Sequence, residues 1–596
     1  MLLITTEPLS ELKNKENLLL LGEWCKPYPN SKKFQSGNCI TLNDPWSKRA
    51  TKQKAYTYTQ EFYSRLITSL TKSLNEIHQT NFSERFWIIL CGPWLKLLIN
   101  SSFHSWELIS EAKKNYKDLS TLHIDCKLID FVAHNMGDFE FLVTSDQFKF
   151  SLNQEIINYL GGIKKVKSKN KKSPSDTMLL IKSNVEVLNK NTKVKLKIVI
   201  SRLLNKVIKI SKNINKYEIF GIYLSKAYFI STFLRLFSIP RYLEAYKSIE
   251  SIDVKPDPYI RSKVDLDLSA KNEYEKFFKK IIFQTIPLTY LEGFKDLISL
   301  VDSFKLKKQP FSITTSTHHF SDDLFKMYAA INAEKKSKIK IVSHGGFGKF
   351  LYSDFMDHEF DICDDYFTWG WSEYSNKCTR GFLPKPVKEV FNKKDNNKYL
   401  LVLLDSFKHT KFIDSNPTYD EFIKNYLPEQ ITFLKRINKQ TSHDGIIKLG
   451  TYKRNDFYKN NIELRIKNSL PNKNINFSYR EDNFIKIASK ARIIVCTYNG
   501  TNDIEALRLN RPTIIFWNIK KFELIESAKK KFEGLKSSKI FHESPESAAQ
   551  HFNEIWDDPY EWWHSKTVQD ARKEFLNEYG RVTKSPVKEL VSFIKK

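Results

Sequence analysis

A polar turn near residue 497 carries the side chains of this chain that are best suited to chemistry. The apolar run 491–495 has the composition of a buried strand, and the turn after it supplies Thr497, Gly500 and Thr501. A helix pattern follows and carries Glu505 one turn from its start. Backbone N–H groups and hydroxyls at a helix N-terminus bind diphosphates, and a nearby carboxylate can hold sugar hydroxyls. The segment predicts a nucleotide site, with an ordinary strand–helix–strand unit as the alternative.

A second polar turn, rich in glycine, follows the apolar strand pattern 339–343. It begins with His344 and continues through Gly345, Gly346 and Gly348. Ligands bind at the carboxyl ends of strands in open α/β sheets, and glycines let the backbone come close to a ligand. His344 stands where a general base or a phosphate partner would stand, and a structural histidine at a turn is the alternative.

The preceding strand pattern ends in the acidic, histidine-bearing run 316–323, just before a helix pattern over 324–333. His319, Asp322 and Asp323 in this run are further candidates for the base that would accept a proton from an acceptor hydroxyl. The residue types alone do not select one of them over His344.

A metal site would need carboxylates clustered at a strand end. The acidic pairs 322–323 and 364–365 each lack a third partner at a suitable spacing, so we expect no metal. The charge of a leaving phosphate would instead be met by helix N-termini and by cationic and hydroxyl side chains at the end of the strand pattern 446–449 and just beyond it: Lys448, Tyr452, Lys453 and Arg454.

Strand and helix patterns alternate over most of the chain, which predicts an α/β fold with parallel sheets. A proline-containing segment at 383–386 and a polar run at 391–398 indicate a boundary. We therefore expect two Rossmann-like lobes that face a cleft, an acceptor lobe over 1–385 and a donor-nucleotide lobe over 390–560. Residues 561–596 are expected to form C-terminal helices that cross back to the first lobe.

The region of about 151–280 differs from the rest of the first lobe. Residues 164–172 are rich in lysine, and over residues 190–216 lysines alternate irregularly with apolar residues. The apolar residues fit one face of an amphipathic helix: Leu196, Val199, Ile200, Leu203, Val207 and Ile210. We expect a basic helical insertion, which either packs on the lobe beside it or binds an anionic acceptor or membrane surface.

Two short apolar runs near the N-terminus, 18–21 and 86–90, are expected to be strands that each end at a turn, with a helix over 56–77 between them. Trp24 and Trp94 follow these runs. Both are better explained by packing than as walls of an acceptor cleft.

Composition sets further bounds. A chain of 596 residues should form more than one domain, and its net charge of +28 favours anionic partners. Nucleic acid is not expected, since no zinc-finger, RNA-recognition or helix-turn-helix pattern occurs. The seven cysteines are scattered, and neither a signal peptide nor a membrane-spanning run is found. These features predict a cytoplasmic protein that can touch the inner membrane through basic patches.

Motifs along nearly the whole chain resemble the transferase family encoded in bacterial O-antigen and surface-polysaccharide gene clusters. The matching pieces are LGEWC at 21–25, CGPWL at 91–95, IP at 286–287, LE at 291–292, the segment 314–326, SHGGFG at 343–348, FTWGW at 367–371 and the block 497–517. Two positions depart from the expected pattern. Ser343 replaces a glutamine, and Lys448 replaces an arginine and so loses the bidentate fork.

The resemblance implies a GT-B-like glycosyltransferase that uses a nucleotide-activated sugar, with no other cofactor. The implied acceptor is a glycan or lipid-linked glycan of a surface polysaccharide, such as O-antigen in lipopolysaccharide. A polyol-phosphate transferase and a non-catalytic scaffold of the same pathway remain open. Nucleotide binding would separate the scaffold from the enzymes, and donor screening would separate the two enzymes.

Overall fold

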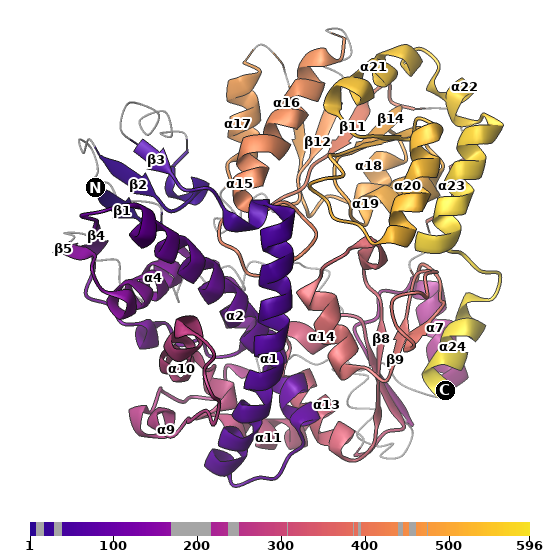
Figure 1. Cartoon of the computed structure of the whole chain (residues 1–596). Helices are drawn as coiled ribbons and strands as arrows, with labels where there is room; N and C mark the ends of the chain where they lie inside the picture. Colours follow the sequence, from indigo (N-terminus) through magenta and orange to yellow (C-terminus); the bar gives the residue numbers. More distant parts are fainter. Residues whose placement is uncertain are drawn as a thin grey trace.

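The computed structural model describes residues 1–596 except for 7–16, 29–38, 168–215, 237–248, 305, 307, 385–386, 391–394, 439–444, 452–459, 472 and 474. Most of the helix expected over 190–216 therefore lies outside the described residues, as do Tyr452, Lys453 and Arg454. The described residues form three parallel sheets, which confirms the predicted α/β class (Figure 1).

The first sheet has the order β3-β2-β1-β4-β5, so its strand order reverses between β1 and β4. Its strands are β1 (Leu2–Ile4), β2 (Leu18–Leu20), β3 (Cys39–Thr41), β4 (Ser120–His123) and β5 (Lys164–Lys167). The helices of this part are α1 (Arg49–His78), α2 (Glu84–Asn115), α3 (Met136–Leu142) and α4 (Asp146–Leu160). The predicted strand at 18–21 and the helix at 56–77 are confirmed by β2 and α1.

The run 86–90 lies in helix α2, so the prediction of a strand there was wrong. Helix α2 is buried on nearly all sides, and its apolar residues therefore lack the period of an amphipathic helix. Its N-terminus is capped by the Ser83 hydroxyl, which accepts a hydrogen bond from the Phe86 amide at 3.3 Å. Among the described residues, α2 is also the one helix long and apolar enough to cross a membrane, and 89% of its apolar window is buried inside the protein.

The two tryptophans after these runs pack in the core, as expected. Trp94 is fully buried and donates from Nε1 to the carbonyl oxygen of Thr285 at 3.1 Å. Trp24 donates from Nε1 to the carbonyl oxygen of Thr5 at 3.1 Å. Neither indole hydrogen bond is directed to a ligand site.

The second sheet has the order β10-β9-β8-β7-β6, which follows the chain in one direction without a reversal. Its strands are β6 (Tyr217–Phe220), β7 (Ser312–Thr315), β8 (Lys338–Val342), β9 (Asp365–Phe367) and β10 (Cys378–Thr379). Helices of this part of the chain are α7 (Lys226–Leu236), α9 (Pro258–Ser262), α10 (Glu273–Thr285), α11 (Phe294–Ser303), α12 (His318–Ser321), α13 (Asp323–Glu334) and α14 (Asp354–Ile362).

Residues 1–385 thus hold two five-stranded sheets, where the sequence suggested one lobe with a helical insertion. The expected insertion, 151–280, supplies strands to both sheets, β5 to the first and β6 to the second. The lysines of 164–167 form β5 instead of a loop, and all four residues are exposed. Lysine is common on such edge strands because its charge discourages pairing with another chain.

The third sheet has the order β13-β12-β11-β14-β15-β16, with a reversal between β11 and β14. Its strands are β11 (Tyr399–Val402), β12 (Gly445–Lys448), β13 (Asn476–Ser478), β14 (Ile493–Cys496), β15 (Thr513–Phe516) and β16 (Phe541–His542). The helices that follow β11 in the chain are α15 (Tyr419–Glu421), α16 (Leu427–Arg436), α17 (Ile462–Ser469), α18 (Phe484–Ala488), α19 (Asn502–Leu509), α20 (Glu526–Ser537), α21 (Pro545–Ile555), α22 (Pro559–Trp563), α23 (Lys566–Tyr579) and α24 (Pro586–Lys595).

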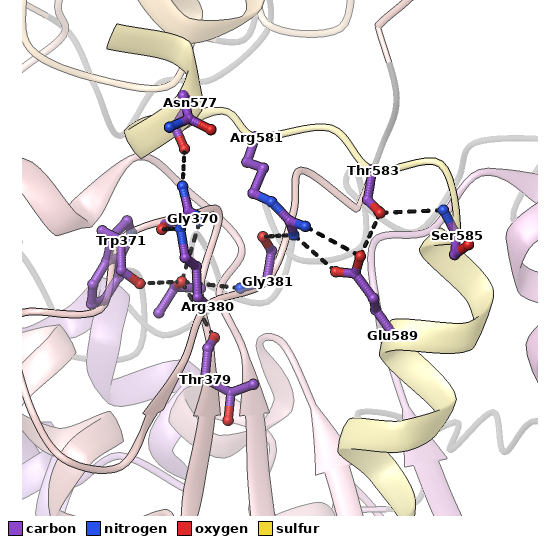
Figure 2. A network of polar contacts seen from close by, with 11 residues as sticks. Gly370, Trp371, Thr379, Arg380, Gly381, Asn577, Arg581, Thr583, Ser585 and Glu589 are labelled. Atoms are coloured by element: carbon purple, nitrogen blue, oxygen red, sulfur yellow. Dashed lines mark hydrogen bonds and ion pairs between the residues drawn. The ribbon is translucent and has the colours of Figure 1, made fainter. Parts of the chain in front are cut away.

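The C-terminal segment crosses from the third sheet to the second, where α24 packs against α7 and β7 (Figure 1). Figure 2 shows the polar contacts that hold this crossing. Arg581 donates to the carbonyl oxygen of Gly381 at 2.9 Å and pairs with Glu589 at 2.8 Å. A side chain at Gly370 would place its Cβ 2.5 Å from the carbonyl oxygen of Glu578, so this crossing requires a glycine there.

Candidate functional site

A cavity of about 620 Å³ opens at the carboxyl edge of the third sheet. Its walls come from the loops after β11, β12 and β13 and from the start of α19; they include Asp405, Lys448, Arg480, Tyr498, Asn502 and Glu505. The strand order reverses between β11 and β14, and open α/β sheets bind ligands in the crevice at such a point. The volume lies within the usual range of small-molecule sites, about 300–1,000 Å³.

The turn between β14 and α19 contributes the predicted Glu505 to this cavity. Glu505 is half-buried and lies one turn into α19, in the wall of the cavity. Beside it, the hydroxyl of Tyr498 donates to Oδ1 of Asn502 at 2.7 Å. The side chain of Thr501 makes no capping bond to α19, and within the first turn of this eight-residue helix the Asp503 carboxylate accepts the Ile504 amide at 2.7 Å.

Thr497 and Gly500 are not part of the cavity wall, contrary to the prediction. Thr497 is fully buried; its hydroxyl donates to the carbonyl oxygen of Val402 at 2.7 Å and lies 2.6 Å from the hydroxyl of Tyr426. The carbonyl oxygen of Gly500 instead accepts a hydrogen bond from Lys349 at 3.0 Å. Both residues hold the turn in place behind the cavity.

Lys448 lies in the cavity wall at the end of β12, and its Nζ donates to the carbonyl oxygen of Tyr479. Burial lowers the pKa of the Lys448 ammonium, although nearby Asp482 and Glu481 partly offset this. Tyr452, the other residue expected near a phosphate, lies outside the described residues.

Asp405 and Arg480 belong to the cavity, although the sequence analysis assigned neither of them a role in the site. Asp405 follows β11, and its carboxylate accepts hydrogen bonds from Nδ2 of Asn460 at 2.8 Å and from the amide of Ser406 at 3.0 Å. Burial raises the pKa of Asp405 to about 6. Asp405 carries the signal that marks the other turns, since it stands directly after the strand pattern 399–404.

The charges in the cavity wall are mixed. Its carboxyl groups belong to Asp405, Glu481, Asp482 and Glu505, and its cations to Lys448 and Arg480. An anionic ligand would therefore depend on the positive end of α19 as well as on these two cations. A carboxylate such as Glu505 suits the neutral hydroxyl-bearing part of the same ligand.

The glycine turn after β8 contacts the turn after β14, so the carboxyl edges of the second and third sheets face each other. The Gly346 amide donates to Oγ1 of Thr501 at 3.3 Å. A Cβ at Gly346 would lie 2.6 Å from the carbonyl oxygen of Gly500, and one at Gly348 would lie 2.4 Å from the ring of Trp371. These two glycines therefore serve close packing of protein on protein, whereas the sequence suggested room for a ligand.

A buried ion pair fixes this contact. Nζ of Lys349 lies 2.7 Å from Oδ2 of Asp503, the second residue of α19, and both side chains are fully buried. Burial lowers the pKa of Lys349, an effect that Asp503 opposes. Buried pairs of this kind hold two elements in one geometry because either charge alone would be strongly unfavourable.

His344 is half-buried beside the glycine turn. Its side chain is 20% exposed, and its ring packs edge-on against Phe355 with centroids 5.2 Å apart. Burial lowers the pKa of the His344 imidazole to about 4. The ring is therefore neutral at pH 7, which suits a base and does not suit a cation that holds a phosphate.

The other two predicted catalytic residues are placed for packing. His319 is fully buried and so has no surface for an acceptor. Asp322 caps α13 by accepting the Phe325 amide at 3.0 Å, and its other oxygen lies 2.5 Å from Nδ1 of His318. Neither His319 nor Asp322 touches the cavity of the third sheet. Asp323, the other acidic candidate, is also fully buried, with Oδ1 2.7 Å from the hydroxyl of Tyr290.

Glu140 of α3 contacts both the helix that follows β7 and the segment that follows β11. Its carboxylate accepts hydrogen bonds from the Ser321 hydroxyl at 2.6 Å and from Nζ of Lys411 at 2.7 Å. Burial alone would raise the pKa of Glu140, but the charge and hydrogen bond of Lys411, helped by the Ser321 hydroxyl and by Arg480, outweigh burial and lower that pKa. Arg480 of the cavity wall thus lies close enough to Glu140 of α3 to act on its charge.

Comparison with known proteins gave one family match, over nearly the whole chain. The model described as "LIC12162 family transferase" matches residues 1–594. No curated protein sequence matched.

Solved structures gave distant matches. TarM of S. aureus, solved with UDP, is 13% identical, with a TM-score of 0.32 over 48% of this chain and 55% of TarM. HepE of Anabaena, solved with UDP and glucose, is 10% identical, with a TM-score of 0.35 over 64% of this chain and 98% of HepE. MurG of Acinetobacter baumannii is 10% identical, with a TM-score of 0.29 over 51% of this chain and 77% of MurG.

Proposed function

Because the chain belongs to the LIC12162 family of transferases, we propose that it transfers a sugar from a nucleotide-activated donor whose nucleotide binds in the cavity of the third sheet. The observation that carries this proposal is the cavity itself. It lies where the strand order reverses, and Glu505 enters it one turn from the start of α19. This is the placement by which α/β proteins bind ribose and phosphate together.

In this proposal Glu505 accepts hydrogen bonds from the ribose hydroxyls, and the donor phosphates lie at the N-terminus of α19. Lys448 and Arg480, which line the same cavity, supply positive charge to the phosphates. The negative charge that develops on the leaving nucleotide is then stabilised by groups already in place, so the proposal requires no metal. Residues 390–560 would form the donor-nucleotide lobe and residues 1–385 the acceptor lobe.

His344 is the proposed general base. It lies two residues before Gly346, so its Cα is within roughly 7 Å of the residue that contacts Thr501. The acceptor hydroxyl gives its proton to His344, its oxygen bonds to the sugar carbon, and the bond from that carbon to the phosphate breaks. The nucleotide leaves with the electron pair.

We further propose a role in building a bacterial surface polysaccharide such as O-antigen, with a glycan or lipid-linked acceptor. The reaction would take place in the cytoplasm, where nucleotide sugars serve as donors. The net charge of +28 favours contact with the anionic inner membrane, where a lipid-linked acceptor would lie. A polyol-phosphate donor would use the same groups and is separated by donor screening.

The test is calorimetric titration with a panel of nucleotide sugars, followed by the Glu505→Ala variant. Loss of a charge-assisted hydrogen bond to ribose should weaken binding by about 10- to 100-fold. The melting temperature should not change, because Glu505 is half-buried at the cavity wall. Glu526→Ala serves as a matched control, since that side chain is 74% exposed at the start of another helix, α20.

Three results would count against this proposal. If no nucleotide sugar binds the wild type, the scaffold alternative replaces it. Preference for a nucleotide-activated polyol would identify the polyol-phosphate transferase. Unchanged affinity in Glu505→Ala, or an equal loss in Glu526→Ala, would show that Glu505 does not hold the ribose.

A further inference from the structure

A second cavity, of about 590 Å³, lies outside the proposed nucleotide site and shares no lining residue with it. Its walls come from α1, the C-terminal half of α2 and the start of α10, and α2 packs against both of the other helices (Figure 1). Four aromatic residues and three glutamates line the cavity, and its lining includes no lysine, arginine or histidine. The proposed transfer reaction gives this cavity no role.

One face of α2 supplies five of the lining residues: Phe103, Trp106, Glu107, Ser110 and Glu111. Residues three and four positions apart lie on the same side of a helix, so these five form one stripe. All five are half-buried, whereas every other residue within 103–112 is buried. The stripe is therefore the side of this helical segment that opens to solvent, and it opens into the cavity.

The aromatic rings form one continuous wall. The ring centroids of Tyr58 and Phe103 lie 4.8 Å apart, those of Phe103 and Tyr274 4.9 Å, and those of Tyr274 and Trp106 5.8 Å. The Tyr274 hydroxyl donates into the core, to the carbonyl oxygen of Ile99 at 3.0 Å, which fixes its ring. Such a wall contacts carbon atoms of a ligand, and the quadrupoles of its rings attract positive charge.

Two carboxylates stand one helical turn apart on the same stripe. Like charges four residues apart on a helix repel each other, so the pair of Glu107 and Glu111 is unfavourable without a cation. Glu107 accepts a hydrogen bond from Nε1 of Trp46 at 2.6 Å, which is a neutral donor. Burial raises the pKa of Glu107, and the charges of Asp44 and Glu111 add to this effect. The Trp46 indole and the His104 imidazole partly offset it.

The third glutamate of the cavity is already paired. Oε1 of Glu273 lies 2.5 Å from Nζ of Lys276, and its Oε2 accepts the Tyr159 hydroxyl at 2.9 Å. The negative charge that remains for a ligand is therefore that of the two glutamates on α2. This local excess of acid occurs on a chain whose net charge is +28.

We propose that this cavity binds an organic cation, an alkylated amine or quaternary ammonium group, whose charge lies beside Glu107 and Glu111 and whose carbon atoms contact the aromatic wall. Such a ligand relieves the repulsion between the two glutamates and places its charge near Trp106, the ring type that attracts cations best. Within the described part of the chain, no group of three His, Cys, Asp or Glu side chains is arranged to hold a metal ion, and a metal ion would leave the aromatic wall unused. A neutral sugar could stack on the same wall but would leave the repulsion in place.

The experiment is calorimetric titration of the full-length protein with choline and, separately, with spermidine in low-salt buffer. The neutral alcohol in which carbon replaces the choline nitrogen is the matched ligand control, since it has the same shape without the charge. We expect saturable binding of both cations. Choline should bind at least about tenfold more tightly than the neutral alcohol, because only choline gains from the carboxylates and from the ring quadrupoles.

Two variants separate the charge from the aromatic wall. Glu111→Gln keeps the shape of the side chain and removes one charge, and Trp106→Leu removes a ring; each should weaken choline binding by about tenfold. Glu61→Gln is the matched control, since Glu61 is an exposed glutamate on α1 outside the cavity wall, and it should bind choline as the wild type does. Glu111 is half-buried, so the Gln variant should melt at the wild-type temperature.

Three results would overturn the proposal. They are no saturable binding of choline or spermidine up to about 10 mM, equal affinity for choline and the neutral alcohol, and wild-type affinity in both Glu111→Gln and Trp106→Leu. A neutral trisaccharide that binds the wild type and Glu111→Gln equally but not Trp106→Leu would assign the cavity to a sugar instead. The result is independent of the proposed transfer reaction, because Glu505→Ala should bind choline normally.

Discussion

The carboxyl edges of the second and third sheets face each other across one contact, yet they are built in opposite ways. The third sheet reverses its strand order and opens a cavity of about 620 Å³ with half-exposed charged walls. The second sheet runs in one direction, and the turns at its edge bury His319 and Asp323. Similar polar turns thus line an open cavity where neighbouring connections diverge, and form a packed cluster where they do not.

The largest expected effect comes from removing the ion pair at the contact between the second and third sheets. In Lys349→Met, Asp503 is left buried and unpaired, which should destabilise the protein by about 3–5 kcal/mol in urea unfolding. The double variant with Asp503→Leu should recover part of this loss. The exposed pair of Lys536 and Glu543 is the control, and Lys536→Met should cost at most about 1 kcal/mol. An equal, small loss in both single variants would contradict the ion-pair account.

The second prediction concerns the pH dependence of stability at the packed edge. The His344 pKa is about 4 in the folded protein and about 6.5 in the unfolded chain. Between these two pH values the imidazole is therefore protonated in the unfolded chain and neutral in the folded protein. This contribution is present above pH 6.5 and is lost as the pH falls toward 4. His344→Gln should lack it, so its loss of stability from pH 7.5 to 5 should be about 2 kcal/mol smaller than that of the wild type. Parallel curves for the two proteins would exclude it.

The third prediction concerns the C-terminal crossing that ties the helices after the third sheet to the second sheet. Arg581→Ala removes a hydrogen bond to Gly381 and an ion pair with Glu589, both partly buried. We expect a loss of about 1–1.5 kcal/mol, seen as faster amide exchange in α24. Lys584→Ala, an exposed neighbour, is the control. If α24 exchanges at the same rate in both variants, this network does not hold the crossing.

The smallest expected effect concerns Asp405 in the wall of the third-sheet cavity. Asp405 ionises near pH 6, so between pH 7.5 and 5.5 it loses a negative charge in the cavity wall. For charges roughly 10 Å apart at an intermediate dielectric, this should strengthen binding of a nucleotide sugar about threefold, or ~0.7 kcal/mol. The diphosphate of such a donor does not titrate in this range. Asp405→Asn should bind with the same affinity at both pH values, and a persistent pH dependence in this variant would assign it to another group.

Much of the fold could be predicted from the sequence because local patterns specify it. The alternation of apolar runs and helical periods gave the parallel strands β8, β11, β12, β14 and β15. The exception is α2, whose run 86–90 reads as a strand because a helix buried on all sides has no polar face to give it a period. The segment over 151–280 contributes single strands to two sheets, which no local pattern signals.

For the site, the sequence by itself determined which polar residues stand at the ends of the strands. Two of these residues, Glu505 and Lys448, lie in the cavity wall. Tertiary structure alone decided which polar residues line the cavity. Thr497 and His319 are polar residues that follow strands, just as the residues of the cavity wall do. Packing nevertheless buries both of them completely. The reason is that strand order and the contact between sheets depend on pairings distant in the chain, and these decide where a polar turn opens to solvent and where it packs against protein.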